Sequence, residues 1–160
     1  MDKEVFTILL LCAHALLLIY AAVRDVQTYT IRNRLVLVVA ALAPVFWFAE
    51  GLGVEDIAIR IGMGVAIFGL FALAYRFGMM GGGDVKLAAA IALWFSAFET
   101  LRFVVVMSIA GGIVTLVALA AHKTAKNDAG ETGRVKVPYG VAIALGGLWN
   151  VAQRFLNHFG

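Results

Sequence analysis

Six apolar stretches, joined by short polar segments, constrain this chain more than any other feature. A helix that crosses a bilayer needs about 20 mostly apolar residues. The six candidates are Val5–Val23, Leu35–Ala49, Ile57–Tyr75, Val85–Phe98, Leu101–Ala121 and Val137–Phe155. The second and fourth are short for a full span, so they either extend into their flanking loops or sit deeper in the bundle. We therefore predict an all-α, polytopic integral membrane protein with six transmembrane helices.

Composition supports a membrane location. The chain is 62% hydrophobic, whereas a soluble domain is about 45–50% apolar. Its small net charge of +3 suits basic loops that face anionic membrane lipid, and no basic run is dense enough to predict a nucleic-acid partner. The acidic start of the chain precedes a long apolar run, so the first stretch is expected to be a retained span rather than a signal peptide.

The distribution of charge predicts an orientation, because cytoplasmic loops carry an excess of Lys and Arg. If the N-terminus is outside, the inner loops hold nine of the thirteen basic residues: Arg24, Arg32, Arg34, Arg76, Lys86, Lys123, Lys126, Arg134 and Lys136. We predict that both termini lie outside and that residues 1–160 form a single membrane domain. The polar segment 122–136 is expected to be a cytoplasmic loop within it.

Two carboxylates stand at the ends of apolar stretches on the predicted inner side. Asp25 lies at the end of the first stretch, and Asp84 follows three glycines. Ionisable residues near a bilayer are costly and are therefore functional candidates. Each also has a structural explanation: Asp25 can pair with a neighbouring arginine, and Asp84 can be the N-cap of a helix that begins near Val85.

Taken together, the two carboxylates point to acid–base chemistry. Two neighbouring carboxylates cannot both ionise cheaply, so one retains its proton. The ionised group can then take a proton from water while the other donates to a carbonyl oxygen, as in aspartic proteases, with no cofactor. The adjacent glycines would let an extended substrate peptide approach closely. A cation channel or transporter could use the same residues, and a non-catalytic assembly scaffold is a further alternative.

Three segments resemble one protein family. The run Gly81-Gly82-Gly83-Asp84-Val85-Lys86-Leu87 is similar to the GxGDVKL stretch of the type IV prepilin peptidases, which are membrane aspartyl proteases. The segment from Asp25 to Asn33 resembles their first catalytic segment, which reads Asp, five residues, then Ile-Pro-Asn; Arg32 stands here in place of the proline. Val137-Pro138-Tyr139-Gly140 resembles the (I/V)PYG opening of their last helix.

This resemblance implies a role for each segment. It makes Asp25 and Asp84 the catalytic aspartates and Gly81, Gly82 and Gly83 a loop beside the substrate. Family members remove the leader from prepilin or pseudopilin precursors at the cytoplasmic face of the bacterial inner membrane. The chain lacks the paired-cysteine insert of bifunctional members, so it resembles the short form associated with Tad/Flp pili, and no methyltransferase activity is expected. Archaeal preflagellin peptidases share the GxGD motif and remain an alternative.

Other polar residues suggest packing rather than chemistry. His14, midway along the first stretch, is expected to hydrogen-bond to a neighbouring helix, and Asn150 either bonds across helices or faces the outer interface. Cys12 is the only cysteine, and no His, Asp and Glu cluster has ligand spacing, so we predict no metal site. No GxSxG or Walker A motif is present.

Overall fold

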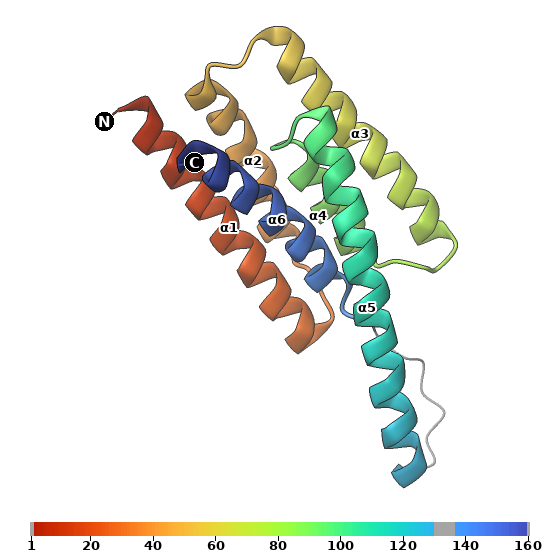
Figure 1. Ribbon diagram of the computed structural model, residues 1–160. Coiled ribbons are helices and arrows are strands. Elements are labelled where there is room, and N and C mark those ends of the chain that lie inside the picture. Colours follow the sequence, from red (N-terminus) through yellow and green to blue (C-terminus); the bar gives the residue numbers. More distant parts are fainter. Residues whose placement is uncertain (1, 130–136, 160) are drawn as a thin grey trace.

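The computed structural model describes residues 2–129 and 137–159, and this part of the chain forms six α-helices and no strand (Figure 1). Successive helices alternate in direction, so the start of α1 and the end of α6 lie at the same end of the bundle (Figure 1). The predicted all-α class is confirmed. The helices are α1 (Lys3–Thr28), α2 (Asn33–Glu50), α3 (Val54–Arg76), α4 (Gly82–Ala92), α5 (Ala97–Ala129) and α6 (Tyr139–Phe159).

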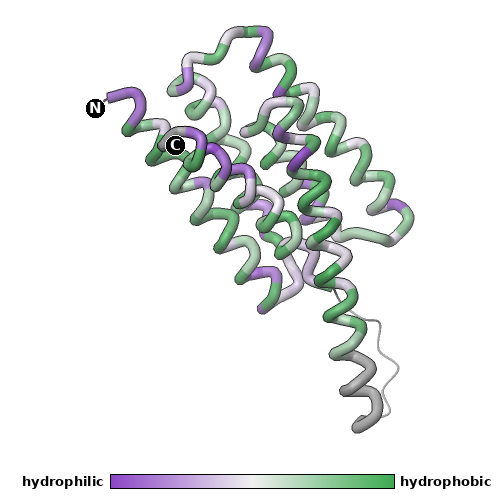
Figure 2. Tube along the Cα trace, in the orientation of Figure 1, coloured by the Kyte–Doolittle hydropathy of each residue, from purple (hydrophilic) through white to green (hydrophobic). Residues whose placement is uncertain are grey.

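Four of the described helices are long and apolar enough to cross a membrane: α1, α2, α3 and the Ala97–Ala121 part of α5. Their outer surfaces are largely hydrophobic (Figure 2). The helix α6 has sufficient length but carries polar side chains such as Asn150 and Arg154. The chain is a multi-pass membrane protein, and the number of six spans stays a prediction.

The fourth predicted span, Val85–Phe98, has the wrong bounds. The helix α4 has 11 residues, which at 1.5 Å per residue is about 16 Å, half the thickness of the hydrocarbon core. The chain then turns at residues 93–96, and α5 begins at Ala97. The expectation that this segment sits deep in the bundle is met, because α4 packs against α2, α3 and α6.

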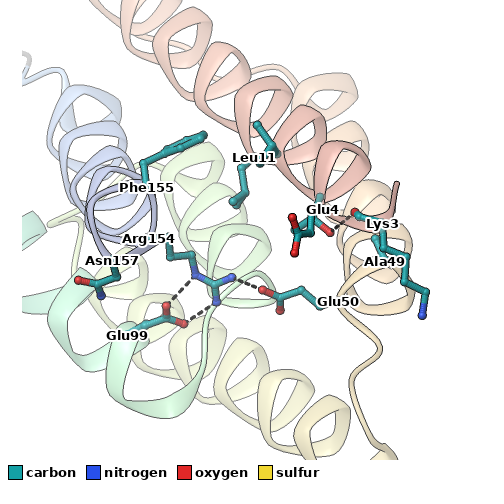
Figure 3. Close-up of a pocket in the computed structure, with 11 residues that line it drawn as sticks. Lys3, Glu4, Leu11, Ala49, Glu50, Glu99, Arg154, Phe155 and Asn157 are labelled. Carbon is teal, nitrogen blue, oxygen red and sulfur yellow. Dashed lines mark hydrogen bonds and ion pairs between the residues drawn. The ribbon is translucent and has the colours of Figure 1, made fainter. Parts of the chain in front are cut away.

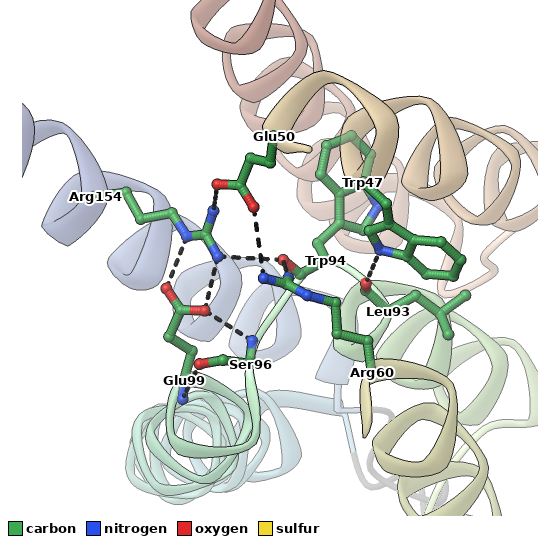
Figure 4. Close-up of polar contacts among 8 residues, drawn as sticks. All are labelled: Trp47, Glu50, Arg60, Leu93, Trp94, Ser96, Glu99 and Arg154. Atoms are coloured by element: carbon green, nitrogen blue, oxygen red, sulfur yellow. Dashed lines mark hydrogen bonds and ion pairs between the residues drawn. The ribbon is translucent and has the colours of Figure 1, made fainter. Parts of the chain in front are cut away.

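Side-chain donors satisfy the carbonyl groups beyond the buried end of α4. The carbonyl oxygen of Leu93 accepts a hydrogen bond from Trp47 Nε1 at 2.8 Å. That of Trp94 accepts from the guanidinium groups of Arg60 and Arg154 (Figure 4). A helix end enclosed in the bundle requires such partners, since its last carbonyls have none within the helix.

Two carboxylates hold these arginines in place (Figure 4). Arg154 donates to both oxygens of Glu99, at 2.7 and 2.8 Å, and to Glu50 at 2.7 Å. Glu50 lies 3.5 Å from Arg60 as well. Arg154, Glu50 and Glu99 also line a hollow of about 540 Å³ together with residues of α1 (Figure 3). The network and the hollow lie at the opposite end of α4 from Asp84.

The packing in the interior around Trp94 tests the predictions made for two polar residues, His14 and Asn150. His14 is completely buried and stacks on the Trp94 ring with 4.1 Å between ring centroids. Neither ring nitrogen has a hydrogen-bond partner among the described residues, so the predicted interhelical hydrogen bond of His14 is wrong. Asn150 Nδ2 donates to the carbonyl oxygen of Glu99 at 2.6 Å, so the predicted bond across helices is confirmed there.

The predicted polar loop 122–136 begins within a helix. The helix α5 continues to Ala129, and residues 130–136 lie outside the described part. Its last turns contain Ala and Lys, which favour helix, and the first glycine in the segment is Gly130. Polarity alone therefore misplaced the end of the helix.

Candidate active site

Three helix ends that are distant in the sequence contribute to the site. Asp25 lies in the last turn of α1, Asp84 in the first turn of α4, and Gly140 in the first turn of α6. Because successive helices alternate in direction, these turns lie at the same end of the bundle (Figure 1). The alternation thus places the two candidate aspartates predicted from the sequence on one side of the molecule.

The carboxylate of Asp25 is buried and held by the main chain of α6. The residue is 4% exposed, and its Oδ2 accepts a hydrogen bond from the N–H of Gly140 at 2.7 Å. The first N–H groups of a helix have no partner within it and bind anions well. A Cβ atom at Gly140 would lie 2.8 Å from Oδ2 and 2.9 Å from the Cβ of Asp25. Only glycine permits this contact without displacing the carboxylate.

The carboxylate of Asp84 turns back onto the start of its own helix. The helix begins at Gly82 with Gly81 as its N-cap, so the prediction of Asp84 as the N-cap residue is wrong. Asp84 instead accepts a hydrogen bond at Oδ2 from the N–H of Gly81, at 3.2 Å. A carboxylate at this third position stabilises the N-terminus in the manner of a capping box.

The two carboxylates interact electrostatically. Burial, and to a smaller extent the negative charge of Asp25, raise the pKa of Asp84 to about 7, against the opposing effect of the hydrogen bond from Gly81. Near neutral pH the pair therefore carries one proton that a lone exposed aspartate would have lost. One ionised and one protonated carboxyl group is the arrangement that acid–base catalysis by two aspartates needs.

The glycines before Asp84 pack against the chain itself. A Cβ atom at Gly83 would lie 3.0 Å from the carbonyl oxygen and 3.1 Å from the Cβ of Ile31, in the α1–α2 connection. At Gly82 it would lie 3.4 Å from the ring of Tyr75. The sequence predicted the close approach of a substrate peptide, whereas the close neighbours in the structure are Ile31 and Tyr75 of the chain itself. The role of the glycines beside a substrate stays a prediction.

The α1–α2 connection has a defined backbone. Tyr29 adopts a left-handed conformation, with φ 50°, and its N–H donates to the Asp25 carbonyl oxygen at 2.7 Å. Arg32 has φ −73°, within the range that a proline ring imposes, so the backbone at this position would also accommodate a proline. Lys86 Nζ donates to Asn33 Oδ1 at 3.2 Å and links α4 to α2.

Gly140 is the residue of this site that the sequence reasoning missed. Its signal was the Val137-Pro138-Tyr139-Gly140 segment, which indicated the start of a helix but not a contact with Asp25. Among the described residues, no group of three or more His, Cys, Asp or Glu side chains could hold a metal ion.

Residues 12–116 match the model of a protein family described as the type IV leader peptidase family. The matched region contains Asp25 and Asp84 and ends before Gly140. No curated protein matches the chain, and no solved structure matches it.

Proposed function

The chain belongs to the type IV leader peptidase family, and we propose that it is a membrane-embedded aspartyl endopeptidase that removes the leader peptide from prepilin-like precursors. The observation that carries this proposal is the interacting pair of Asp25 and Asp84, which come from α1 and α4. Family membership supports peptide hydrolysis, and two coupled carboxyl groups are sufficient for it without a metal or organic cofactor.

Different surroundings support different roles for the two aspartates. Asp25 accepts the shorter main-chain hydrogen bond, 2.7 Å against 3.2 Å for Asp84, and a short bond of this kind favours a negative charge on Asp25. We assign Asp25 as the general base and Asp84, with its raised pKa, as the general acid. Gly140 is then a positioning residue that sets the direction of the Asp25 carboxylate.

The reaction follows from these roles. Asp25 takes a proton from a water molecule as its oxygen attacks the scissile carbonyl carbon, while Asp84 donates its proton to the carbonyl oxygen. The tetrahedral diol then collapses: Asp84 takes back a hydroxyl proton, and Asp25 gives its proton to the leaving amine. The C–N bond breaks, and the pair returns to its initial state with one proton shared.

The position of the pair at helix ends suits a peptide that enters from the membrane surface. The helix α1 has 26 residues, a length of about 39 Å that exceeds the hydrocarbon core, so its last turn can lie at the headgroups. In the proposed orientation this surface faces the cytoplasm of a bacterial cell. A prepilin or pseudopilin would place its hydrophobic helix beside the bundle and its leader in the aqueous phase.

The test is cleavage of a prepilin-like peptide by purified protein in liposomes. Asp25→Asn and Asp84→Asn should each lower the cleavage rate by at least about 100-fold, since each removes an acid–base group. Asp56→Asn, which changes an exposed aspartate in the first turn of α3, is the matched control and should cleave normally. Normal cleavage by either of the first two variants contradicts the proposal. Cation flux without cleavage supports the channel or transporter instead.

A further inference from the structure

A second site candidate lies between α1 and α2. Three arginines line a hollow of about 280 Å³ there, at the same end of the bundle as the aspartates. Arg24 comes from the last turns of α1, Arg32 is the N-cap residue of α2, and Arg34 lies in its first turn. The rest of the lining is apolar or aromatic: Leu17, Tyr20, Leu35 and Val38.

The three positive charges lack a counter-charge in the described part of the chain. The ion pairs of the described residues involve Arg60 and Arg154, at the other end of α4. The nearest carboxylate in sequence, that of Asp25, accepts from Gly140 instead. The Nε of Arg24 is buried and has no hydrogen-bond acceptor among these residues. A buried donor on a charged group without a partner is costly, so an external anion would stabilise this arrangement.

The chemistry of the donors favours a phosphate. A guanidinium group presents its N–H donors in a planar fork that fits two oxygens of a phosphate group, and it is less strongly hydrated than an ammonium group. Three such groups around one hollow can neutralise a phosphodiester from several directions. Basic pockets between membrane helices at the cytoplasmic side commonly hold anionic lipid headgroups.

The apolar lining distinguishes a lipid from a free phosphate. Along α1, Tyr20 and Leu17 lie one and two turns farther from the helix end than Arg24, and along α2, Val38 lies one turn farther than Arg34. The charged part of the hollow therefore lies at the membrane surface and the apolar part lies deeper. Tyr20 and Val38 remain 49% and 46% exposed, which leaves room for a chain from the bilayer.

We propose that this hollow binds an anionic phospholipid, with its phosphodiester at Arg24, Arg32 and Arg34 and the start of an acyl chain along Leu17 and Val38. The proposed lipid site includes neither Asp25 nor Asp84. It requires only that this end of the bundle lies at a membrane surface. Its failure and that of the proposed peptidase are therefore distinguishable, because binding is measured without cleavage.

The experiment compares lipid retention by native mass spectrometry. Purified protein is equilibrated with equal amounts of phosphatidylglycerol and phosphatidylcholine, and the ratio of the two retained lipids is measured. The wild-type protein should retain phosphatidylglycerol preferentially. Arg34→Gln should lower this preference about fivefold, the effect of one charge near an anionic lipid surface. Arg34→Lys, which keeps the charge but not the fork, should lower it less.

Arg76→Gln is the matched control. Arg76 is exposed and ends α3 at the same end of the bundle, but it does not line the hollow, so its substitution should change the preference less than twofold. If Arg34→Gln does not fold, Arg32→Gln replaces it with the same expected loss. Equal losses in the hollow and control variants, no preference in the wild type, or displacement of the lipid by millimolar inorganic phosphate would overturn the proposal.

Discussion

At the scale of single residues, the contact between Gly140 and Asp25 leaves no room for a side chain. Gly140→Ala should lower the cleavage rate by about 10- to 100-fold, because a methyl group 2.8 Å from Oδ2 must displace the carboxylate. Gly112→Ala in α5 is the control, since a Cβ atom there meets nothing within 4 Å. Rates of peptide cleavage and melting temperatures are measured for both. Equal rates in the two variants would remove Gly140 from the site.

The raised pKa of Asp84 has a consequence for stability that does not depend on catalysis. The ordinary pKa of the group is 3.8, and in the folded protein its pKa is about 7. Between pH 3.8 and about pH 7, the folded protein therefore holds a proton on Asp84 that the unfolded chain has lost. The stabilisation is therefore complete below pH 3.8 and is lost as the pH rises through 7. Asn does not titrate, so Asp84→Asn keeps its stability as the pH rises. The melting temperature of this variant minus that of the wild type should therefore increase by several degrees between pH 5 and pH 8. A constant difference across this range would contradict the raised pKa.

The residues of this candidate site differ in how far the sequence could indicate them. The candidates Asp25 and Asp84 were visible because charges beside apolar stretches are costly. The contact between Gly140 and Asp25 could not be predicted, because a glycine at the start of a helix carries no side chain that would indicate a partner 115 positions away. His14 was misjudged for a related reason: a ring that can form hydrogen bonds can equally stack on another ring, and only the position of Trp94 decides between them.

At the scale of elements, the enclosed end of α4 depends on Arg154. Arg154→Met keeps much of the apolar stem but leaves Glu99 and Glu50 without their closest cation and removes a donor to the Trp94 carbonyl oxygen. Breaking a largely buried charge network of this kind costs about 3–5 kcal/mol, so a marked fall in melting temperature is expected.

Arg102→Met is the matched control for Arg154→Met. Arg102 lies over the ring of Phe98, 5.1 Å from its centroid, and no described carboxylate pairs with it. Thermal unfolding in detergent, followed by circular dichroism, compares the two variants. Similar melting temperatures would show that the network contributes little to the stability of the bundle.

The bounds of α4 show where hydropathy ceases to be informative. Residues 85–98 are almost uniformly apolar, and the turn at 93–96 lies inside this run because the bundle buries Trp94 and Phe95 there. A continuous apolar stretch predicts burial but cannot separate a helix from a buried turn. The polar residues Glu99 and Arg102 suggested a boundary that the structure places inside the first turns of α5.

At the scale of the whole molecule, the proposed orientation places opposite ends of α3 on opposite sides of the membrane. In a Cys12→Ser background, Val54→Cys and Phe77→Cys introduce exposed thiols just inside and just beyond the two ends of this helix. A membrane-impermeant maleimide should label Val54→Cys on intact cells and Phe77→Cys only after permeabilisation. The reverse pattern would place Asp25 and Asp84 outside the cell and would exclude cleavage at the cytoplasmic face.

The helical class and the alternating path were predictable because apolar length and loop charge act over the whole chain. The packing of the helices was not, since it depends on where small residues allow close contact. A Cβ atom at Gly64 on α3 would lie 3.4 Å from the Ala89 carbonyl oxygen on α4, and one at Gly146 on α6 would lie 2.9 Å from that of Phe103 on α5. The Ala142-xxx-Gly146 spacing is typical of close helix contacts, but no such spacing identifies Gly64 among the 17 glycines of the sequence.

The capping of α4 by Arg154 also bears on biosynthesis. Trp47 and Arg60 precede α4 in the chain, so their bonds to the Leu93 and Trp94 carbonyl oxygens can form as soon as α4 is made, whereas Arg154 follows about 60 residues later. A half-length helix cannot settle among acyl chains alone, because its terminal carbonyls would be left in hydrocarbon. We therefore expect α4 to insert together with α2 and α3, and the ion pairs of Arg154 with Glu50 and Glu99 to form only when the sixth segment leaves the translocation machinery.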